Sequence, residues 1–327
     1  MRGQKGRQGM SKIALKDVSH EEWLHLRKQG IGGSDAGAIC GVNPYRSALN
    51  VYVDKTSDAS EGTDSEAMRQ GRDLEEYVAE RFMEETGLKV RKSNFLYRSE
   101  AYPFMQANVD RIIIGENAGL ECKTASAYSA EKWSDGAVPE SYQIQCAHYM
   151  SVMGWDCMYI ACVILGKDFK IVKLDRDENL IRDLIEIEKD FWTKHVIPKV
   201  MPEPDGSKAY DELLSGYLGT SRESSIPLLG FDKGLARREE IDMLLEKLET
   251  EKREIDQKIK VYMQDNEAAE SAAYRVTWKG CETKRLDTAR LKAENPKVYE
   301  QYLKTSVSRR FLVKKKVLQE LSIQEVA

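Results

Sequence analysis

Residues 106–126, QANVDRIIIGENAGLECKTAS, contain the segment that decides the fold. Two strand-like runs, 101–114 and 120–126, flank the turn sequence GENAG, and this spacing suits an antiparallel hairpin. Asp110 lies toward the end of the first run, and ten residues separate it from Glu121. Because side chains along a strand alternate between its two faces, Glu121 and Lys123 should share one face and Cys122 should point to the other. The segment therefore predicts two carboxylates and an ammonium group on one patch.

The patterns on either side of this segment predict a mixed α/β core of about 200 residues. Apolar residues at helical spacing alternate with short extended runs, in the order helix, meander of strands, helix, strands, helix. A small-residue turn before residue 34 predicts a short helix, with Ser34 or Asp35 as its N-cap. The expected helices cover residues 20–29, 66–85, 140–154 and 176–195, and the expected strands cover 90–99, 101–114, 120–126, 156–165 and 168–175.

With 327 residues, the chain has room for about two domains. We expect a disordered N-terminus over residues 1–12, an α/β core over 13–200 and a linker over 201–233. The C-terminal part, 234–327, should contain a long helix followed by a small strand–helix–strand unit. The long helix has one apolar stripe and should pack on the body or form a helical hairpin, with an oligomerising coiled coil as the alternative.

Charge is distributed unevenly along the chain. The 50 Lys and Arg residues nearly balance 54 Asp and Glu residues, for a net charge of −4. Residues 271–316 hold thirteen basic and four acidic residues, a balance of +9, so the remainder carries −13. Contact with DNA or with a partner protein should therefore be localised to this basic segment, unless it is simply a solvated face. The candidate contacts are Arg309, Arg310, Lys314 and Lys315.

Several classes of protein are excluded by composition. No apolar run is long enough to span a membrane, and the basic start lacks the apolar region of a secretory signal. The six cysteines are scattered without a CxxC pair, so we expect reduced thiols and neither disulfides nor a zinc or iron–sulfur site. No Walker motif is present. We expect a cytoplasmic protein without a membrane partner.

The acid pair and the lysine suit phosphodiester hydrolysis. Carboxylate oxygens are the ligands that Mg²⁺ prefers in proteins. A neighbouring lysine can orient or deprotonate a water molecule, or stabilise the charge that builds on a phosphorus centre. The plain alternative is an exposed salt bridge on an edge strand, but Glu121 and Lys123 lie among apolar and small residues.

Five motifs occur in one order: IGGSDAGAICG, GRDLEEYVAERF, QANVDRII, LECKTAS and ESYQIQCAHYMSVMG. Together they resemble the family of lambda-type phage exonucleases, or YqaJ-like viral recombinases, within the PD-(D/E)XK nuclease superfamily. The resemblance covers about residues 20–195. It implies a restriction-endonuclease-like core with a mixed central sheet flanked by helices, extended here by a helical and small α+β C-terminal part.

The resemblance also implies an activity. Enzymes of this family are Mg²⁺-dependent 5′→3′ exonucleases. They digest one strand of linear duplex DNA and leave 3′ overhangs for recombination by single-strand annealing. Two Mg²⁺ ions are expected, with Mn²⁺ as a substitute. The implied partners are duplex ends with a 5′-phosphate, a separate annealing protein, and further copies of the chain in a trimeric or tetrameric ring. The setting would be a bacterial host carrying a phage or prophage.

Carried over residue by residue, the resemblance makes Asp110, Glu121 and the Cys122 carbonyl metal ligands. Lys123 would position or activate the attacking water. Glu75 in GRDLEEYV matches a helix glutamate that reaches the metal site from the side. Its alternative is a surface residue paired with Arg72 or Arg81, and Glu76 is a competitor for the role.

The resemblance assigns DNA contacts as well. Arg27 and Ser34 match the pair that holds the 5′-phosphate. A helix cap is the alternative role for Ser34, and the two roles can coexist. Asn108 stands where the family motif can carry serine. Tyr142 and Gln145, three apart on one helix, would reach the scissile phosphate; helix packing is their alternative, and Gln143 is a substitute. His148 is expected to be structural.

Two other functions remain open at this point. The first is a PD-(D/E)XK endonuclease, which would cut closed DNA as well as ends. The second is a non-catalytic DNA-binding scaffold that loads an annealing protein. The presence of Asp110, Glu121 and Lys123 argues against the scaffold, because a protein without catalysis has no need of this set.

Overall fold

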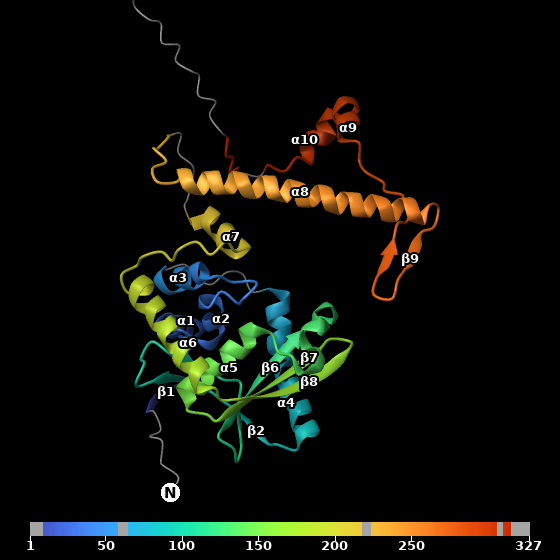
Figure 1. Ribbon diagram of the computed structural model, residues 1–327. Coiled ribbons are helices and arrows are strands. Elements are labelled where there is room, and N and C mark those ends of the chain that lie inside the picture. Colours follow the sequence, from blue (N-terminus) through green and yellow to red (C-terminus); the bar gives the residue numbers. More distant parts are fainter. Residues whose placement is uncertain (1–8, 58–64, 218–223, 306–309, 315–327) are drawn as a thin grey trace, which may run out of the picture. The chain divides into compact units, whose positions relative to one another are not determined.

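The computed structural model describes residues 9–57, 65–217, 224–305 and 310–314. The chain divides into two compact units, Met1–Gly219 and Thr220–Ala327 (Figure 1). The predicted α/β core lies in the first unit. No helix in the described part of the chain is long and apolar enough to cross a membrane.

A five-stranded mixed sheet forms the centre of the first unit. Its strand order is β2 (Val90–Lys92), β5 (Arg111–Ile113), β6 (Ala118–Ala125), β7 (Cys157–Ile164) and β8 (Asp168–Asp175). Strands β6 and β7 run parallel, and the other neighbours are antiparallel. The predicted hairpin is confirmed, because β5 and β6 pair with Arg111 opposite Leu120.

Helices cover both faces of this sheet. Helix α4 (Glu66–Thr86) packs Val78 and Phe82 against Leu120 of β6 on one face. On the other face, helix α5 (Glu140–Met153) packs with Met158 of β7. Alternation along the strands produces this division, since the neighbouring β7 residues Cys157 and Met158 belong to different clusters. The predicted fold class, an α/β core with a mixed central sheet flanked by helices, is confirmed.

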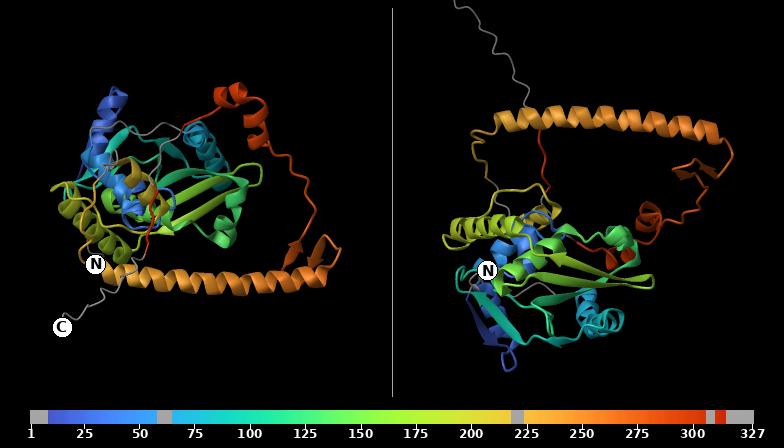
Figure 2. Two further views of the ribbon diagram at one scale, coloured as in Figure 1. Left: turned by 90° about the horizontal axis from the view of Figure 1, so that it is seen from above. Right: turned by 60° about the horizontal axis from the view of Figure 1, so that its bottom comes forward.

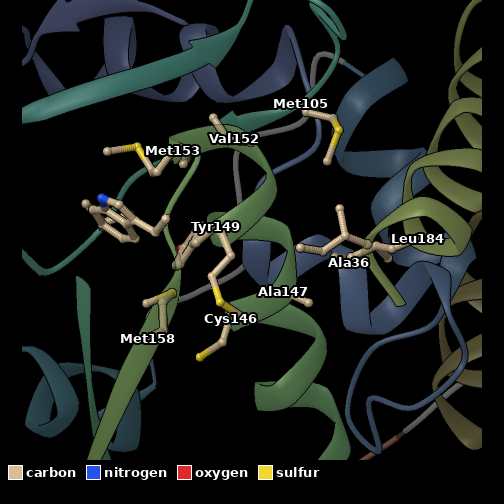
Figure 3. Close-up of a cluster of buried hydrophobic side chains, with 14 of the residues drawn as sticks. Ala36, Met105, Cys146, Ala147, Tyr149, Val152, Met153, Met158 and Leu184 are labelled. Atoms are coloured by element: carbon tan, nitrogen blue, oxygen red, sulfur yellow. The ribbon is translucent and has the colours of Figure 1, made fainter. Parts of the chain in front are cut away.

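The largest hydrophobic cluster surrounds α5. Nine consecutive residues of this helix, from Gln145 to Met153, are buried. Figure 3 shows Cys146 and Tyr149 of α5 among Met158, Ala36 of α2 (Gly33–Ile39) and Leu184 of α6 (Glu178–Phe191). A helix enclosed on all sides has little freedom to shift, so polar side chains at its N-terminal end are held in fixed positions.

A second sheet supports the N-terminal helices. Its order is β1 (Met10–Ala14), β3 (Phe95–Ser99) and β4 (Gln106–Ala107), all antiparallel. The expectation that residues 1–12 are disordered is therefore wrong for residues 10–12, because β1 pairs with β3 along its whole length. Helices α1 (His20–Lys28) and α3 (Ala48–Thr56) lie in this region, whereas the 3₁₀ segment Ala127–Gly136 packs on β7 and β8 of the central sheet.

The expected linker also begins too early. After α6 and a π-helical turn, Trp192–Val196, helix α7 covers Lys208–Tyr217. Tyr210 of α7 is buried beside Tyr52 and Phe191, and its hydroxyl donates to the Pro202 carbonyl over 2.9 Å. The core therefore extends beyond residue 200. The prolines at 202 and 204 and Gly206 suggested a loose chain, yet they only lead into a helix that packs on α3.

The second unit begins with α8 (Asp232–Met263), which Figure 2 shows as one uninterrupted rod. Its apolar stripe, including Leu244, Leu248 and Ile255, is exposed. A hairpin of β9 (Ala268–Glu270) and β10 (Arg275–Thr277) follows, then α9 (Thr288–Glu294) and α10 (Pro296–Gln301). The predicted long helix is confirmed, but the last predicted strand is not, because residues 310–314 form no strand.

Candidate active site

One cavity of about 540 Å³ in the first unit collects the core residues that the sequence singles out. They come from α1, α2, α4, α5, β6 and the segment before β5, which are far apart along the chain. The cavity is lined by Arg27, Ser34, Glu75, Asn108, Asp110, Glu121, Cys122, Lys123, Tyr142 and Gln145.

Three polar side chains form a closed network at the centre of the cavity. Lys123 Nζ lies 2.6 Å from Glu121 Oε1 and donates to Gln145 Oε1 over 3.1 Å. The Gln145 amide donates in turn to Glu121 Oε1 over 2.6 Å. Cys122 packs in the cluster on the opposite face of the sheet, with α4. The predicted division of β6 into a polar and an apolar face is confirmed.

The network keeps Lys123 positively charged. Burial alone would lower the pKa of Lys123, but the Glu121 and Asp110 carboxylates outweigh it and raise the pKa above its usual value. The ammonium group also lies 4.7 Å from the centre of the Tyr142 ring, a favourable cation–π contact. Burial raises the pKa of Tyr142, so this side chain is a neutral phenol at physiological pH.

Asp110 is held against β6 by a backbone bond. Its Oδ2 accepts the Cys122 N–H over 2.9 Å, which places the carboxylate beside the strand that carries Glu121. Burial and the nearby Glu121 carboxylate raise the pKa of Asp110 well above its usual value. Two carboxylates in this position repel each other, and a bound cation would relieve that repulsion.

The donor set fits a divalent cation. Glu121 is 3% exposed, and its Oε2 is a buried oxygen without a hydrogen-bond partner. Such an oxygen is costly unless another group satisfies it. Together with the Asp110 carboxylate and the Cys122 carbonyl, it offers the hard oxygen ligands that suit Mg²⁺.

Glu75 lines the same cavity but has a partner that the sequence does not suggest. Its carboxylate pairs with the Arg111 guanidinium, which also contacts Glu76 over 2.9 Å. Within the described residues, no group of three His, Cys, Asp or Glu side chains lies close enough to hold a metal ion. Glu75 as a metal ligand thus stays a prediction, and it requires a change in the contact with Arg111.

The expected anion-binding residues lie on either side of the turn between α1 and α2, Arg27 near the end of α1 and Ser34 at the start of α2. The N-cap of α2 is Gly32, so the prediction of Ser34 or Asp35 at that position is wrong. Asp35 lies further on, and its buried carboxylate accepts the Gly32 N–H over 3.1 Å. Ser34 is consequently free of a capping role and is exposed on the cavity wall, which the half-buried Arg27 also lines.

Two cations neutralise the buried Asp35. Lys55 Nζ lies 2.7 Å and Arg46 Nη1 3.2 Å from its carboxylate oxygens. Burial would raise the pKa of Asp35, but these cations and Arg27 lower it below its usual value. The carboxylate therefore remains charged and fixes the turn that presents Ser34.

Tyr149 and Gly33 are site residues that the sequence does not single out. A Cβ atom at Gly33 would lie 2.5 Å from the Tyr149 ring, so the turn approaches α5 closely. The Tyr149 hydroxyl accepts from the Gln145 amide over 3.3 Å. Helical spacing was the available signal, because Tyr149 follows Tyr142 and Gln145 at intervals of seven and four residues on one face of α5.

His148 and the C-terminal candidates lie elsewhere. His148 is fully buried, with Nδ1 2.7 Å from Glu188 Oε1 and Nε2 2.8 Å from the Gln106 carbonyl, as expected of a structural histidine. Arg310 and Lys314 belong to the second unit, and Arg309 and Lys315 lie outside the described residues. Their contact role stays a prediction.

The chain is similar in sequence to known proteins. Residues 22–156 match the YqaJ-like viral recombinase domain. The protein YqaJ of Bacillus subtilis (strain 168) is 37% identical over 308 residues, which cover 91% of this chain and 95% of that relative. The chain belongs to the YqaJ-like viral recombinase family. Membership of this family supports a nuclease that acts on DNA.

The chain is also similar to solved structures. The alkaline exonuclease LHK-Exo of Laribacter hongkongensis aligns with 61% of this chain and all of its own, at 17% identity and a TM-score of 0.49. A phage related exonuclease of Haemophilus somnus 129PT aligns with 53% of this chain and 97% of its own, at 15% identity and a TM-score of 0.36.

Proposed function

We propose that the protein is a Mg²⁺-dependent 5′→3′ exonuclease that digests one strand of linear duplex DNA and leaves 3′ overhangs for single-strand annealing. One observation carries the proposal: a single cavity holds both the Asp110, Glu121 and Lys123 set and the pair Arg27 and Ser34. The first set suits cleavage of a phosphodiester, and the second suits an anionic strand end.

Arg27 and Ser34 would hold the 5′-phosphate. The guanidinium of Arg27 stacks over the Trp23 ring at 4.9 Å, which orients it toward one side of the cavity. A guanidinium and a hydroxyl together donate several hydrogen bonds to phosphate oxygens. Asn108, exposed at the cavity, adds an amide donor. Holding the end in this way places the first phosphodiester next to the carboxylates.

Asp110, Glu121 and the Cys122 carbonyl would hold Mg²⁺, with Glu75 approaching from α4. Two ions are expected, and Mn²⁺ should substitute because it accepts the same oxygen ligands. When bound, such ions supply Lewis acidity at the scissile phosphate. The unpartnered Oε2 of Glu121 supports this assignment.

Lys123 would stabilise the charge that develops on the phosphate. Glu121 and Gln145 fix its ammonium group before the substrate arrives, so little reorganisation is needed during the reaction. Removing one such preorganised donor typically costs about 10²- to 10³-fold in rate. Tyr142, in contact with Lys123, would border the scissile phosphate.

The family supports a place in recombination. A nuclease that exposes a 3′ strand needs a separate annealing protein to use it, and a ring of three or four copies would keep the enzyme on its substrate. Such an enzyme would work in the cytoplasm of a bacterial host that carries a phage or prophage.

The test uses linear duplex labelled at either strand end, with and without a 5′-phosphate and Mg²⁺, beside a supercoiled plasmid. The proposal predicts mononucleotides from the 5′-phosphorylated strand, dependence on Mg²⁺, and an intact plasmid. Cutting of the plasmid would instead support an endonuclease. Tight binding of ends without any digestion would support a scaffold.

A further inference from the structure

A second cavity of about 430 Å³ adjoins the active-site cavity. The two are lined in common by Glu75, Asn108 and Asp110 and by no other described residue. Beyond that junction the second cavity is bordered by Lys16, Lys92, Ser93 and Asn94, among others. We call it the Lys16–Lys92 cavity. Its size is within the usual range for ligand sites, which is about 300–1,000 Å³.

The chemistry of the Lys16–Lys92 cavity suits phosphate. Its two lysines are cations, and Asn94 and Asn108 add amide groups that can donate hydrogen bonds. Among the described residues, the acidic ones on its wall are Glu75 and Asp110, at the junction with the active site. Lys92 lies beside Glu75, so its charge partly offsets that carboxylate at the junction.

The backbone around this cavity is hydrogen-bonded to the backbone of Asp110. The Ser93 N–H donates to the Asp110 carbonyl over 3.3 Å, and the Leu15 N–H donates to the Asn94 carbonyl over 2.9 Å. Lys92 pairs in the sheet with Arg111, the residue after Asp110. Its ammonium group lies 3.8 Å from Glu75 Oε1. A ligand in this cavity would thus occupy a fixed position relative to the reacting phosphate.

We propose that the Lys16–Lys92 cavity binds backbone phosphates of the cut strand on the 3′ side of the scissile bond. This inference rests on the proposed function. If the terminal phosphate lies at Arg27 and Ser34 and the scissile phosphate at Asp110 and Glu121, the strand must continue past the junction, where this cavity begins. The other source of a phosphate group is the released mononucleotide.

The experiment removes one charge at a time from the DNA and from the protein. Linear 5′-phosphorylated duplexes carry a single neutral methylphosphonate at the second, third or fourth linkage from the 5′ end. The first linkage, which is cut, stays normal. The rate of release of the first nucleotide is measured at subsaturating DNA for the wild type and for Lys16→Ala/Lys92→Ala.

We expect a methylphosphonate at one or two of these linkages to slow the wild type about fivefold, as for an exposed ion pair. The double variant should release the first nucleotide of normal DNA more slowly than the wild type. A methylphosphonate at that linkage should not lower its rate any further. The control Lys170→Ala/Lys173→Ala removes two exposed lysines of β8 that line neither cavity, and it should respond to the methylphosphonates as the wild type does. Lys16→Arg/Lys92→Arg should restore the sensitivity.

A full methylphosphonate effect in the double variant would overturn the proposal. A second result would also overturn it. If a deoxynucleoside monophosphate inhibits the double variant less than the wild type, while both respond equally to the methylphosphonates, the cavity holds the released product. Should the wild type digest no linear duplex, the proposed function fails. In that case the affinities of the wild type and the double variant for the normal and methylphosphonate duplexes are compared without metal. Loss of the methylphosphonate effect in the variant supports the proposed role of the cavity, and persistence of the effect contradicts it.

Discussion

The two carboxylate oxygens of the buried Glu121 have different surroundings. One oxygen contacts both Lys123 and Gln145, and the other has no partner. Glu188 likewise leaves its Oε2 without a partner, but of these two carboxylates it is Glu121 that lines the cavity beside Asp110. The arrangement is consistent with a site that is completed by a cation and a phosphate.

Replacement of Lys123 by Ala tests the role of the ammonium group. We expect duplex binding within a few fold of the wild type and digestion slower by at least about 10²-fold, since the charge acts mainly on the transition state. Binding by fluorescence anisotropy and digestion of end-labelled duplex provide the two values. The control Lys170→Ala removes an exposed lysine of β8 and should change neither. Undiminished digestion by Lys123→Ala would refute the assignment.

Replacement of Asp35 by Asn tests the buried pair beneath the anion-binding turn. Lys55, only 4% exposed, would lose its partner, and breaking such a pair costs about 3–5 kcal/mol. The folded-state pKa of Asp35 lies below its unfolded value of about 3.9, so its stabilising effect is present above about pH 4 and is lost as pH falls further.

Thermal unfolding between pH 2 and pH 7 measures both effects of Asp35→Asn. The variant should be less stable at pH 7 and should lose less stability than the wild type below pH 4. Asp168→Asn, at an exposed pair with Lys170, is the control and should shift the curve much less. Equal acid sensitivity of Asp35→Asn and the wild type would argue against a charged Asp35.

Among single residues, those that follow from local periodicity could be predicted. Glu121 and Lys123 share a face because strand side chains alternate, and Tyr142 and Gln145 share one because a helix repeats. The pairing of Glu75 with Arg111 could not be predicted, because it joins α4 to the end of β5 across 36 positions. The same holds for the cations around Asp35, which depend on how α2 and α3 pack.

At the scale of elements, the turn into α2 depends on a close approach to α5. Gly33→Ala would bring its new methyl group to 2.5 Å from Tyr149, so the turn or the ring must shift. We expect lower stability and a weaker preference for 5′-phosphorylated ends, because Ser34 follows directly. The ratio of digestion rates with and without the 5′-phosphate measures this preference.

Gly71→Ala provides the matched comparison. Gly71 lies within α4, and nothing lies within 4 Å of the position of its Cβ. Alanine should therefore stabilise the helix by about 0.5–1 kcal/mol, the difference in helix propensity. Thermal unfolding of both variants should show opposite signs. A stabilising Gly33→Ala would mean that the turn does not need the contact with Tyr149.

Elements with strong periodicity or a long apolar run follow the sequence closely. Strand β8 matches its predicted range, and α5 and β7 differ from theirs by single residues at their ends. The elements that differ from their predicted ranges depend on tertiary contacts. Strand β1 is stabilised by its pairing with β3, and α7 is stabilised by the packing of Tyr210 against α3 and α6. Composition alone does not contain these contacts.

At the scale of the molecule, the basic segment belongs to a unit separate from the active site. If it binds DNA phosphates, neutralising Arg309, Arg310, Lys314 and Lys315 should lower the salt slope of duplex binding by about 0.9 for each lost contact. Titrations of labelled duplex between 50 and about 200 mM salt measure the slope. Four neutralised lysines of α8, Lys247, Lys252, Lys258 and Lys260, are the control. An unchanged slope would leave docking of a partner as the role of the segment.

The central claim is that the Asp110, Glu121 and Lys123 site removes nucleotides from a 5′-phosphorylated end. The most direct test is a single time course on linear duplex with different labels on the two ends of one strand, in Mg²⁺. The account predicts immediate release of the 5′ label as a mononucleotide, with late loss of the 3′ label, and no release by Asp110→Asn. Release of the 3′ label first, or equal release by Asp110→Asn, would contradict it.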